Sequence, residues 1–555
     1  MMSRTLLALL ALTTAAACVQ ADAADTPIDA ARIEEAVKIL GSDEFGGRAP
    51  GTPGEERTVA YLVSQSQEIG LEPGGENGGW TQRVDLLHTQ LGEPEELSVT
   101  VGDNEVPWTF AEDIYVSTLQ PVDRTAIDNA EMVFVGYGVD APERQWDDFG
   151  DVDLKGKVAV FLVNDPDFEA KEGDPVAGKF SGQAMTYYGR WSYKFEEADR
   201  RGAIGALVVH DTPGAGYGWS TVISGGGENY GLVRAPEDVT SLKLQGWISG
   251  EAAADLFKRA GLDLAAERTR ARTDAFTAVP LKDATFSAAF PVKQQVVQSR
   301  NVLARIPGAK RPDETVMIAA HWDAYGIGAP DAEGRTVRAG ANDDGIGLAA
   351  MFEIARAFKA GPQPDRSVVF AAWTAEERGL LGSEYYALNP IYPLEKTVAN
   401  LTVDVLQTAG LARDVILIGE GQNSLEDDLG RFAKAQGRTV TPDSAPERGL
   451  FYRADHFSLA KRGVPVLLMM GLGGGADLVE GGREAGEAWV ADYTKNRYHT
   501  PGDRWDETWN LAGAVQDIDL VWDMARDLAF SDRWPTWKDG SEFKEVRQKS
   551  AEARR

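Results

Sequence analysis

From residue 299 onward, the chain alternates short, almost fully apolar runs with longer segments of helical spacing. The apolar runs include "TVMIAA", "SVVFAA" and "VPVLLMM", and the longer segments include "GIGLAAMFEIARAF" and "SLEDDLGRFAKAQG". A strand that is apolar on both sides has to be covered on both faces, as in parallel sheets flanked by helices. The pattern therefore predicts an α/β domain with a mainly parallel central sheet covered by helices.

A different sequence pattern interrupts this domain between residues 116 and 290. Short β-rich runs such as "EMVFVGYGV", "GKVAVFLV" and "GAIGALVVHD" alternate there with Gly, Asp and Pro turns. Helical spacing precedes this region in two segments of "ARIEEAVKILGSDEFGGRAPGTPGEERTVAYLVSQSQEIGLEP", around a Gly/Pro-rich loop. An amphipathic helix is predicted near the end in "ETWNLAGAVQDIDLVWDMARDLAF". The simplest organisation is an α/β domain made of residues 24–115 and 291–535, with an inserted β-rich domain, 116–290, and a charged tail, 536–555.

The N-terminus indicates export. "MMSR" is basic, and the apolar run "LLALLALTTAAA" after it is too short to span a bilayer. Together they predict a secretory signal over residues 1–23. The only cysteine, Cys18 in "TAAAC", resembles a bacterial lipoprotein site, whereas ordinary cleavage after Ala23 would remove it. We expect an exported protein, periplasmic or secreted, that reaches the outer membrane only if Cys18 is lipidated.

The charge balance narrows the choice of partners. The chain has 56 basic and 86 acidic residues, a formal net charge of −30. Such a chain is poorly suited to neutralising phosphates, so we expect no nucleic-acid partner. A hydrophobic content of 43% is enough for a full core.

Histidines and carboxylates follow the predicted strands at the points where they end. In an open α/β sheet the loops after the strands converge on one binding site, so residues distant in sequence meet there. Two histidines with several carboxylates suit Zn²⁺ or a similar divalent metal, and two such ions about 3.5–4 Å apart need a bridging carboxylate. The residues are His321, Asp323, Asp343, Glu376, Glu377, Asp404 and His499.

Each of these residues also has an ordinary interpretation. Paired aspartates before a helix are common N-caps, and "EER" is a common solvated turn. Their recurrence in successive loops of one α/β block favours a metal site. His88 and His210 lack this context and are predicted to be structural, and for His456 in "RADHF" a pocket role and a structural role stay open.

The motifs "AAHWDAYG", "GANDDGIG", "TAEERGLLGS", "NLTVDV", "RADHF" and "YHTPGD" resemble, in order, those of the bacterial zinc aminopeptidase family related to glutamate carboxypeptidase and the transferrin receptor. The β-rich insert, with "DLKGKVAVF", is similar to a protease-associated domain. The resemblance implies two zinc ions bridged by Asp343, with His321 and Asp404 on one and Glu377 and His499 on the other. It also makes Glu376 the general base and Asp323 the residue that orients the His321 ring.

The resemblance implies an exopeptidase acting on peptides, most simply an aminopeptidase that uses a metal-bridging water. A carboxypeptidase or dipeptidase on the same scaffold stays open, with Arg378 or Arg453 as a site for a substrate carboxylate. A glutaminyl cyclase-like transferase and a non-catalytic binding protein are the remaining alternatives.

Overall fold

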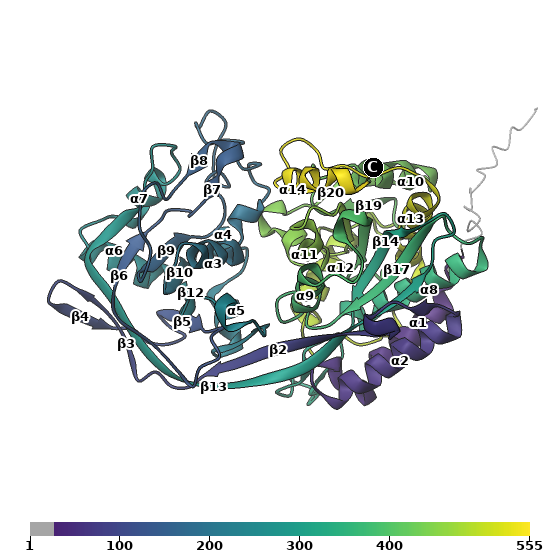
Figure 1. Cartoon of the computed structure of the whole chain (residues 1–555), viewed down its shortest axis with the longest axis horizontal. Coiled ribbons are helices and arrows are strands. Elements are labelled where there is room, and N and C mark those ends of the chain that lie inside the picture. Colours follow the sequence, from purple (N-terminus) through teal and green to yellow (C-terminus); the bar gives the residue numbers. More distant parts are fainter. Residues whose placement is uncertain (1–26, 555) are drawn as a thin grey trace, which may run out of the picture.

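The computed structural model describes residues 27–554 and shows two lobes joined by two long strands (Figure 1). The longest strand, β13 (Val279–Ile306), belongs to the sheets of both lobes. Strand β2 (Thr81–Leu91) runs antiparallel to it, from Val292 to Val302 of β13. A continuous hydrogen-bonded ribbon therefore connects the lobes.

The α/β lobe is built on a sheet whose strand order is β21-β18-β14-β17-β13. The first four strands are parallel and β13 is antiparallel to its neighbour β17. The mainly parallel sheet predicted from the sequence is confirmed. The parallel strands are β14 (Arg311–His321), β17 (Arg366–Trp373), β18 (Thr397–Val403) and β21 (Val466–Met469).

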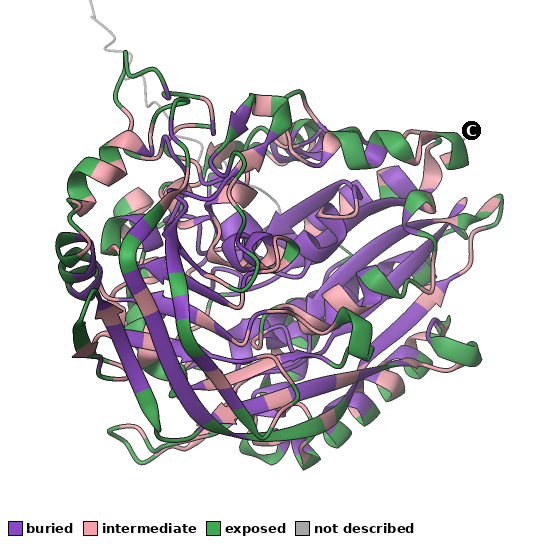
Figure 2. Cartoon of the chain, turned by 60° about the vertical axis from the view of Figure 1, so that its left-hand side comes forward, coloured by how far each residue is buried: buried purple, intermediate pink, exposed green. Residues whose placement is uncertain are grey.

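Helices cover both faces of this sheet, which explains why its strands are apolar throughout. Val316 and Ile318 of β14 face one core, and Met317 and Ala319 face the other. The first core contains α1 (Ala30–Leu40), α2 (Pro53–Ile69), α8 (Ile346–Ala360), α10 (Leu425–Ala435) and α13 (Ala512–Phe530). The second contains α9 (Leu381–Leu388), α11 (His456–Ala460) and Tyr493 of α12 (Gly482–Asn496). Figure 2 shows the buried strands between partly exposed helices.

The β-rich lobe has its own sheet, with the order β13-β6-β9-β10-β12-β5. Its strands are β3 (Glu96–Val101), β4 (Asn104–Pro107), β5 (Ile114–Ser117), β6 (Arg124–Phe134), β9 (Val158–Leu162), β10 (Gly205–Val209) and β12 (Leu244–Ile248). Its longer helices are α3 (Trp191–Arg200), α6 (Gly250–Arg259) and α7 (Leu264–Arg270).

The packing of this lobe begins earlier in the chain than the predicted boundary at residue 116. Leu97 and Val99 of β3 lie in its core, and β3 pairs with β13 from Ala284 to Ala289. That pairing joins segments almost 200 residues apart, and no local pattern in the sequence marks it. The core of the lobe extends from Leu91 to Val292.

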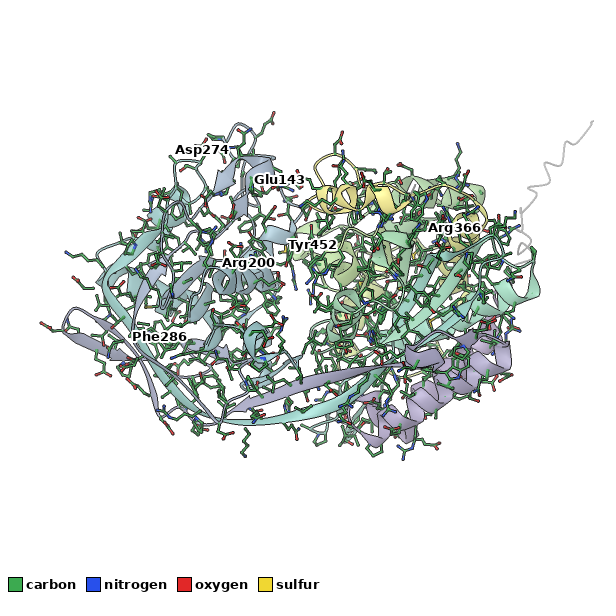
Figure 3. The ribbon with its side chains drawn as sticks, in the orientation of Figure 1. Glu143, Arg200, Asp274, Phe286, Arg366 and Tyr452 are labelled. Atoms are coloured by element: carbon green, nitrogen blue, oxygen red, sulfur yellow. The ribbon has the colours of Figure 1, made fainter. Side chains whose placement is uncertain are left out.

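The segment predicted as a charged tail packs against both lobes. Trp537 and Phe543 are buried in the second core of the α/β lobe, before helix α14 (Lys544–Lys549). Between them and the β-rich lobe, the Glu542 carboxylate accepts hydrogen bonds from the Tyr187 amide (3.0 Å) and the Tyr452 hydroxyl (2.9 Å). Tyr452 lies where the two lobes face one another (Figure 3).

The predicted signal segment, including Cys18, lies outside the described residues. Within residues 27–554, no helix combines the length and apolar composition that crossing a bilayer requires.

Candidate metal centre

Three parallel strands of the α/β lobe end side by side and carry the predicted site residues. His321 is the last residue of β14 and lies in register with Trp373 at the end of β17. Glu376 and Glu377 follow Trp373, and Asp404 follows the end of β18 at Val403. Because the strands are parallel and adjacent, their carboxyl ends place these side chains at one edge of the sheet.

Asp343 and His499 reach the same edge from other elements. Asp343 lies in the short turn η7 (Ala341–Gly345), which leads into α8 and is not helical at Asp343 and Asp344, and the peptide bond between these two residues is cis. His499 lies in the turn that follows α12 and has a positive φ of 60°. The structure thus brings together all five predicted metal ligands.

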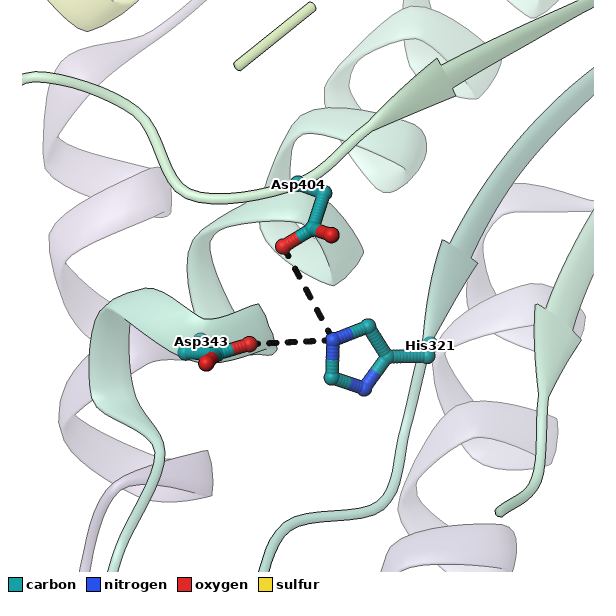
Figure 4. A group of neighbouring side chains, drawn as sticks. All are labelled: His321, Asp343 and Asp404. Atoms are coloured by element: carbon teal, nitrogen blue, oxygen red, sulfur yellow. Dashed lines mark hydrogen bonds and ion pairs between the residues drawn. The ribbon is translucent and has the colours of Figure 1, made fainter. Parts of the chain in front are cut away.

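One group consists of His321, Asp343 and Asp404 (Figure 4). Nε2 of His321 lies 3.1 Å from Oδ1 of Asp343 and 3.8 Å from Oδ1 of Asp404. Nδ1 donates to the backbone carbonyl of Asp323 (3.1 Å). A carbonyl can only accept, so Nδ1 carries the proton and Nε2 keeps a lone pair for a metal.

The second group consists of Asp343, Glu377 and His499. Nε2 of His499 lies 3.1 Å from Oε2 of Glu377 and 3.3 Å from Oδ2 of Asp343. In each group the ligand atoms lie within 4.8 Å of one another. Asp343 offers one oxygen to each group, which is the arrangement of a bridging carboxylate.

The donor atoms fit a divalent cation. Oδ2 of Asp343 and Oδ1 of Asp404 are buried without a hydrogen-bond partner among the described residues. Buried polar atoms are otherwise nearly always paired, so these two oxygens require another partner. Imidazole nitrogens and carboxylate oxygens are the ligands that Zn²⁺ and similar ions take in proteins.

The crowding of carboxylates gives the centre a strong attraction for positive charge. Burial raises the pKa of Glu377 to about 7, and the nearby Asp343 carboxylate adds to the rise. Burial also raises the pKa of Glu376 well above its ordinary value, although His321 opposes the shift. Burial alone would lower the pKa of His499, but Glu377 and Asp343 raise it to about 10. A dication at this position relieves the repulsion between the carboxylates.

Asp323 makes different contacts from those the resemblance implies. Its carboxylate Oδ1 is 3.7 Å from Nδ1 of His321, beyond hydrogen-bond distance. The carboxylate instead accepts from the backbone amides of Glu376 (2.9 Å) and Glu377 (3.4 Å). His321 is oriented by the Asp323 main chain, and the Asp323 side chain positions the glutamate pair.

Asp503 is a residue of the site that the sequence analysis did not single out. Its carboxylate accepts from the amides of Asn342 (3.0 Å) and Asp343 (2.9 Å) and from the Tyr493 hydroxyl (3.1 Å). It therefore holds the backbone from which the Asp343 side chain projects. Its place in "YHTPGD", four residues after His499, is the signal that could have identified it.

Replacing Asp503 with alanine should weaken metal binding without removing a ligand. Two buried amides would lose a charged acceptor, at a cost of about 2–3 kcal/mol each in the free energy of unfolding. Loss of such a supporting carboxylate typically lowers metal affinity about 10- to 100-fold. Competition with a chelator measures the affinity. Metal binding as tight as in the wild type would show that Asp503 does not support the centre.

The other three histidines lie outside the two groups. The His456 ring is fully buried in the core, where burial lowers its pKa to about 3, and it packs edge-on against Phe451. Neither of its ring nitrogens has a hydrogen-bond partner among the described residues. His88 binds Glu228 (2.8 Å), and His210 binds the carbonyl of Tyr217 (3.0 Å).

The ribbon that joins the two lobes reaches the edge of the centre at Arg378, which follows Glu377. The Arg378 guanidinium lies over the rings of Tyr230 (4.9 Å) and Tyr325 (5.1 Å) and 3.5 Å from Glu228. Tyr230 and Glu228 belong to β11 (Glu228–Leu232), which pairs with β2. The Tyr325 ring in turn lies 4.6 Å from the ring of His499. A chain of direct contacts thus links β11, on the ribbon between the lobes, to a candidate metal ligand.

Fold and site together define a two-lobed α/β protein with a histidine–carboxylate centre at the ends of its parallel strands. Residues 301–522 match the model of Peptidase family M28, and this part of the chain is a domain of that family.

Similar proteins are known by sequence and by structure. The chain is 30% identical over 215 residues to leucine aminopeptidase 2 of Trichophyton equinum, covering 37% of this chain and 39% of that protein. It is 29% identical over 187 residues to leupeptin-inactivating enzyme 1 of Streptomyces exfoliatus, covering 33% and 38%. The chain thus spans less than half the length of these relatives. Among solved structures, an aminopeptidase from Aneurinibacillus sp. strain AM-1 aligns over 90% of this chain and 93% of its own, with 19% identity and a TM-score of 0.46.

Proposed function

We propose that the protein is a zinc-dependent aminopeptidase that removes N-terminal residues from short peptides. The observation that carries this proposal is one buried carboxylate, Asp343, shared by two ligand groups. Glu376 lies beside them without belonging to either, with Oε2 3.9 Å from Nε2 of His321. Two ligand sets and one uncommitted carboxylate are what co-catalytic hydrolysis requires.

His321 and Asp404 would hold one metal ion, Glu377 and His499 the other, and Asp343 would bridge them. Bound divalent ions acidify a water and polarise a scissile carbonyl. Glu376 takes the proton of the attacking water and returns it to the leaving amine. Asp323 fixes the Glu376 amide, so that the base keeps its direction while it changes protonation state.

The β-rich lobe, which we infer to be a protease-associated domain, would form one wall of the cleft. The support is that β11, which lies within the predicted insert and pairs with β2, contacts Arg378 next to Glu377 through Tyr230 and Glu228. A wall this close to the centre would favour short peptides over internal cleavage of folded chains. The signal predicted over residues 1–23 supports export to the periplasm or beyond, with outer-membrane attachment only if Cys18 is lipidated.

The test is a panel of aminoacyl-nitroanilides, with N-acetylated and C-terminally amidated peptides of the same sequence alongside. An aminopeptidase releases nitroaniline from free-amine substrates, cleaves amidated peptides and leaves N-acetylated ones intact. Cleavage that requires a free C-terminal carboxylate would replace this proposal with a carboxypeptidase. Cyclisation of N-terminal glutamine without hydrolysis would indicate a transferase.

A specific pair of arginines favours a carboxypeptidase or dipeptidase as the second candidate. Arg190 of the β-rich lobe and Arg453 of the α/β lobe form no ion pair with a carboxylate among residues 27–554, and Nε of Arg190 is buried without a hydrogen-bond partner. Burial and then the Arg453 charge lower the pKa of Arg190 to about 10. Burial raises the pKa of Tyr498, and the Arg453 charge opposes that rise. The Tyr498 ring lies 3.6 Å from that of His499. Two cations without an ion-pair partner in the described part of the chain, of which Arg453 acts on the Tyr498 ring beside His499, suit a substrate carboxylate.

The variant Arg453→Gln separates the two candidates. If the pair binds a substrate carboxylate, KM for peptides with a free C-terminus should rise at least about tenfold, the loss of one charge-assisted contact. An aminopeptidase should keep its KM for nitroanilides within about twofold. Arg462→Gln is the control, because Arg462 is a partly exposed arginine on the same lobe that pairs with Glu384 (3.4 Å).

A further inference from the structure

Arg48, near the N-terminus, lies fully buried behind the metal centre. Its guanidinium donates four hydrogen bonds, all to backbone carbonyls. Nε donates to Trp322 (2.7 Å), Nη1 to Leu40 (2.9 Å) and Ala339 (2.5 Å), and Nη2 to Gly340 (2.8 Å). Among the described residues, no carboxylate forms an ion pair with it. A buried charge held only by main-chain dipoles is unusual, because burying it is costly unless its donors are satisfied.

The four acceptors belong to the segments that carry the centre. Trp322 directly follows His321, and Ala339 and Gly340 immediately precede the turn that contains Asp343. Leu40 ends α1, which packs against α8. One planar fork therefore joins the end of β14 to the loop of the bridging carboxylate, across segments that are far apart in the sequence.

Glycines at two positions allow close approaches of the backbone around Arg48, and one of them leaves space for the guanidinium. Gly340 has a φ of 59°, and a Cβ there would lie 2.9 Å from Nη2 of Arg48 and 2.2 Å from the Asp343 carbonyl. Gly47 has a φ of 68°, and a Cβ there would lie 2.5 Å from the Arg338 carbonyl. Both positions demand glycine for conformation and for space. Gly340 thus leaves the space that the guanidinium occupies, and Gly47 lets the chain just before Arg48 pack against the backbone of Arg338.

We infer that Arg48 is a positioning residue of the metal centre, whose guanidinium fork sets the spacing between His321 and the Asp343 loop. The inference rests on the proposed metal binding. Burial lowers the pKa of Arg48, and the nearby carboxylates of Asp503, Asp323 and Asp344 oppose that shift. The fork geometry is what matters, since a lysine would keep the charge but could not satisfy the same set of carbonyls.

The test compares zinc affinity in Arg48→Lys and Arg48→Met with that of the wild type, by chelator competition on protein shown to be folded by circular dichroism. We expect both variants to bind zinc about 10- to 100-fold more weakly, the range for residues that orient metal ligands. Arg366→Met is the matched control. Arg366 is also fully buried and donates to two carbonyls, those of Leu528 (2.9 Å) and Arg533 (2.8 Å), but it starts β17 at the opposite end of the sheet. The zinc affinity of Arg366→Met should stay within about twofold of wild type, even if its melting temperature falls as far as those of the Arg48 variants.

Wild-type affinity in folded Arg48→Lys would overturn the inference, as would an equal loss in Arg366→Met, which would indicate general loosening. If Arg48→Met does not fold, the lysine variant decides. Tight zinc binding by a wild-type protein that cleaves no peptide of the panel would remove the proposed peptidase function and leave this inference standing. A wild-type protein that binds no zinc would remove both.

Discussion

Glu376→Gln should lower turnover at least about 100-fold while both metal ions stay bound. The substitution keeps the shape of the side chain and removes its ability to accept a proton, and general acid–base catalysis contributes about 10²- to 10⁴-fold. Because Glu376 belongs to neither ligand group, metal content should be unchanged. The measurement is kcat on an aminoacyl-nitroanilide together with elemental analysis of the same sample.

The control for this variant is Glu384→Gln on the following helix, α9. Glu384 is largely buried and pairs with Lys461 (3.0 Å), so its loss perturbs the same region without touching the centre. Its kcat should stay within about threefold of the wild type. A Glu376→Gln enzyme with kcat in that same range would show that another group handles the proton.

Asp343→Ala should abolish metal binding in both groups at once and reduce activity to background. Asp343 is the only residue that the two groups share, and each would be left with two ligands. A metal present at about 1,000 times its dissociation constant stabilises the fold by about 4 kcal/mol. Adding a chelator should therefore lower the melting temperature of the wild type and leave that of Asp343→Ala unchanged.

Asp313→Ala is the control for the bridging residue. Asp313 is an exposed aspartate on the same strand as His321, near the start of β14. Its metal content and its response to the chelator should match the wild type. Two metal ions per chain in Asp343→Ala would rule out the bridging role, and a loss of one ion alone would restrict Asp343 to a single group.

The part of the site that could be predicted from the sequence consists of the residues that follow the ends of strands. His321 and Asp404 come directly after apolar runs and Glu377 follows such a run by a few residues, and a parallel sheet brings such ends together whatever lies between them. The roles of Asp343 as bridge and Glu376 as base came from the resemblance to known enzymes. They stay predictions, which the geometry supports and the two variants above test.

The supporting contacts were not predictable in the same way. The Asp323 carboxylate binds the amides of Glu376 and Glu377, 53 and 54 residues away, and Asp503 binds the amide of Asp343, 160 residues away. Such pairs depend on how loops fold over one another and leave no periodic trace in the sequence. The packing of the C-terminal segment was not predicted for a related reason, because Trp537 and Phe543 are isolated apolar residues in a charged stretch.

The sequence by itself determined the α/β architecture and the chemical types of the residues at the strand ends, because hydrophobic periodicity is a local property that each segment carries alone. Only the tertiary structure decided where the β-rich lobe begins, which carboxylate supports which backbone, and that the Arg48 guanidinium donates to carbonyls next to His321 and the Asp343 turn. Those features depend on registers and contacts between distant segments, whose energies arise only after the chain has closed the loops between them.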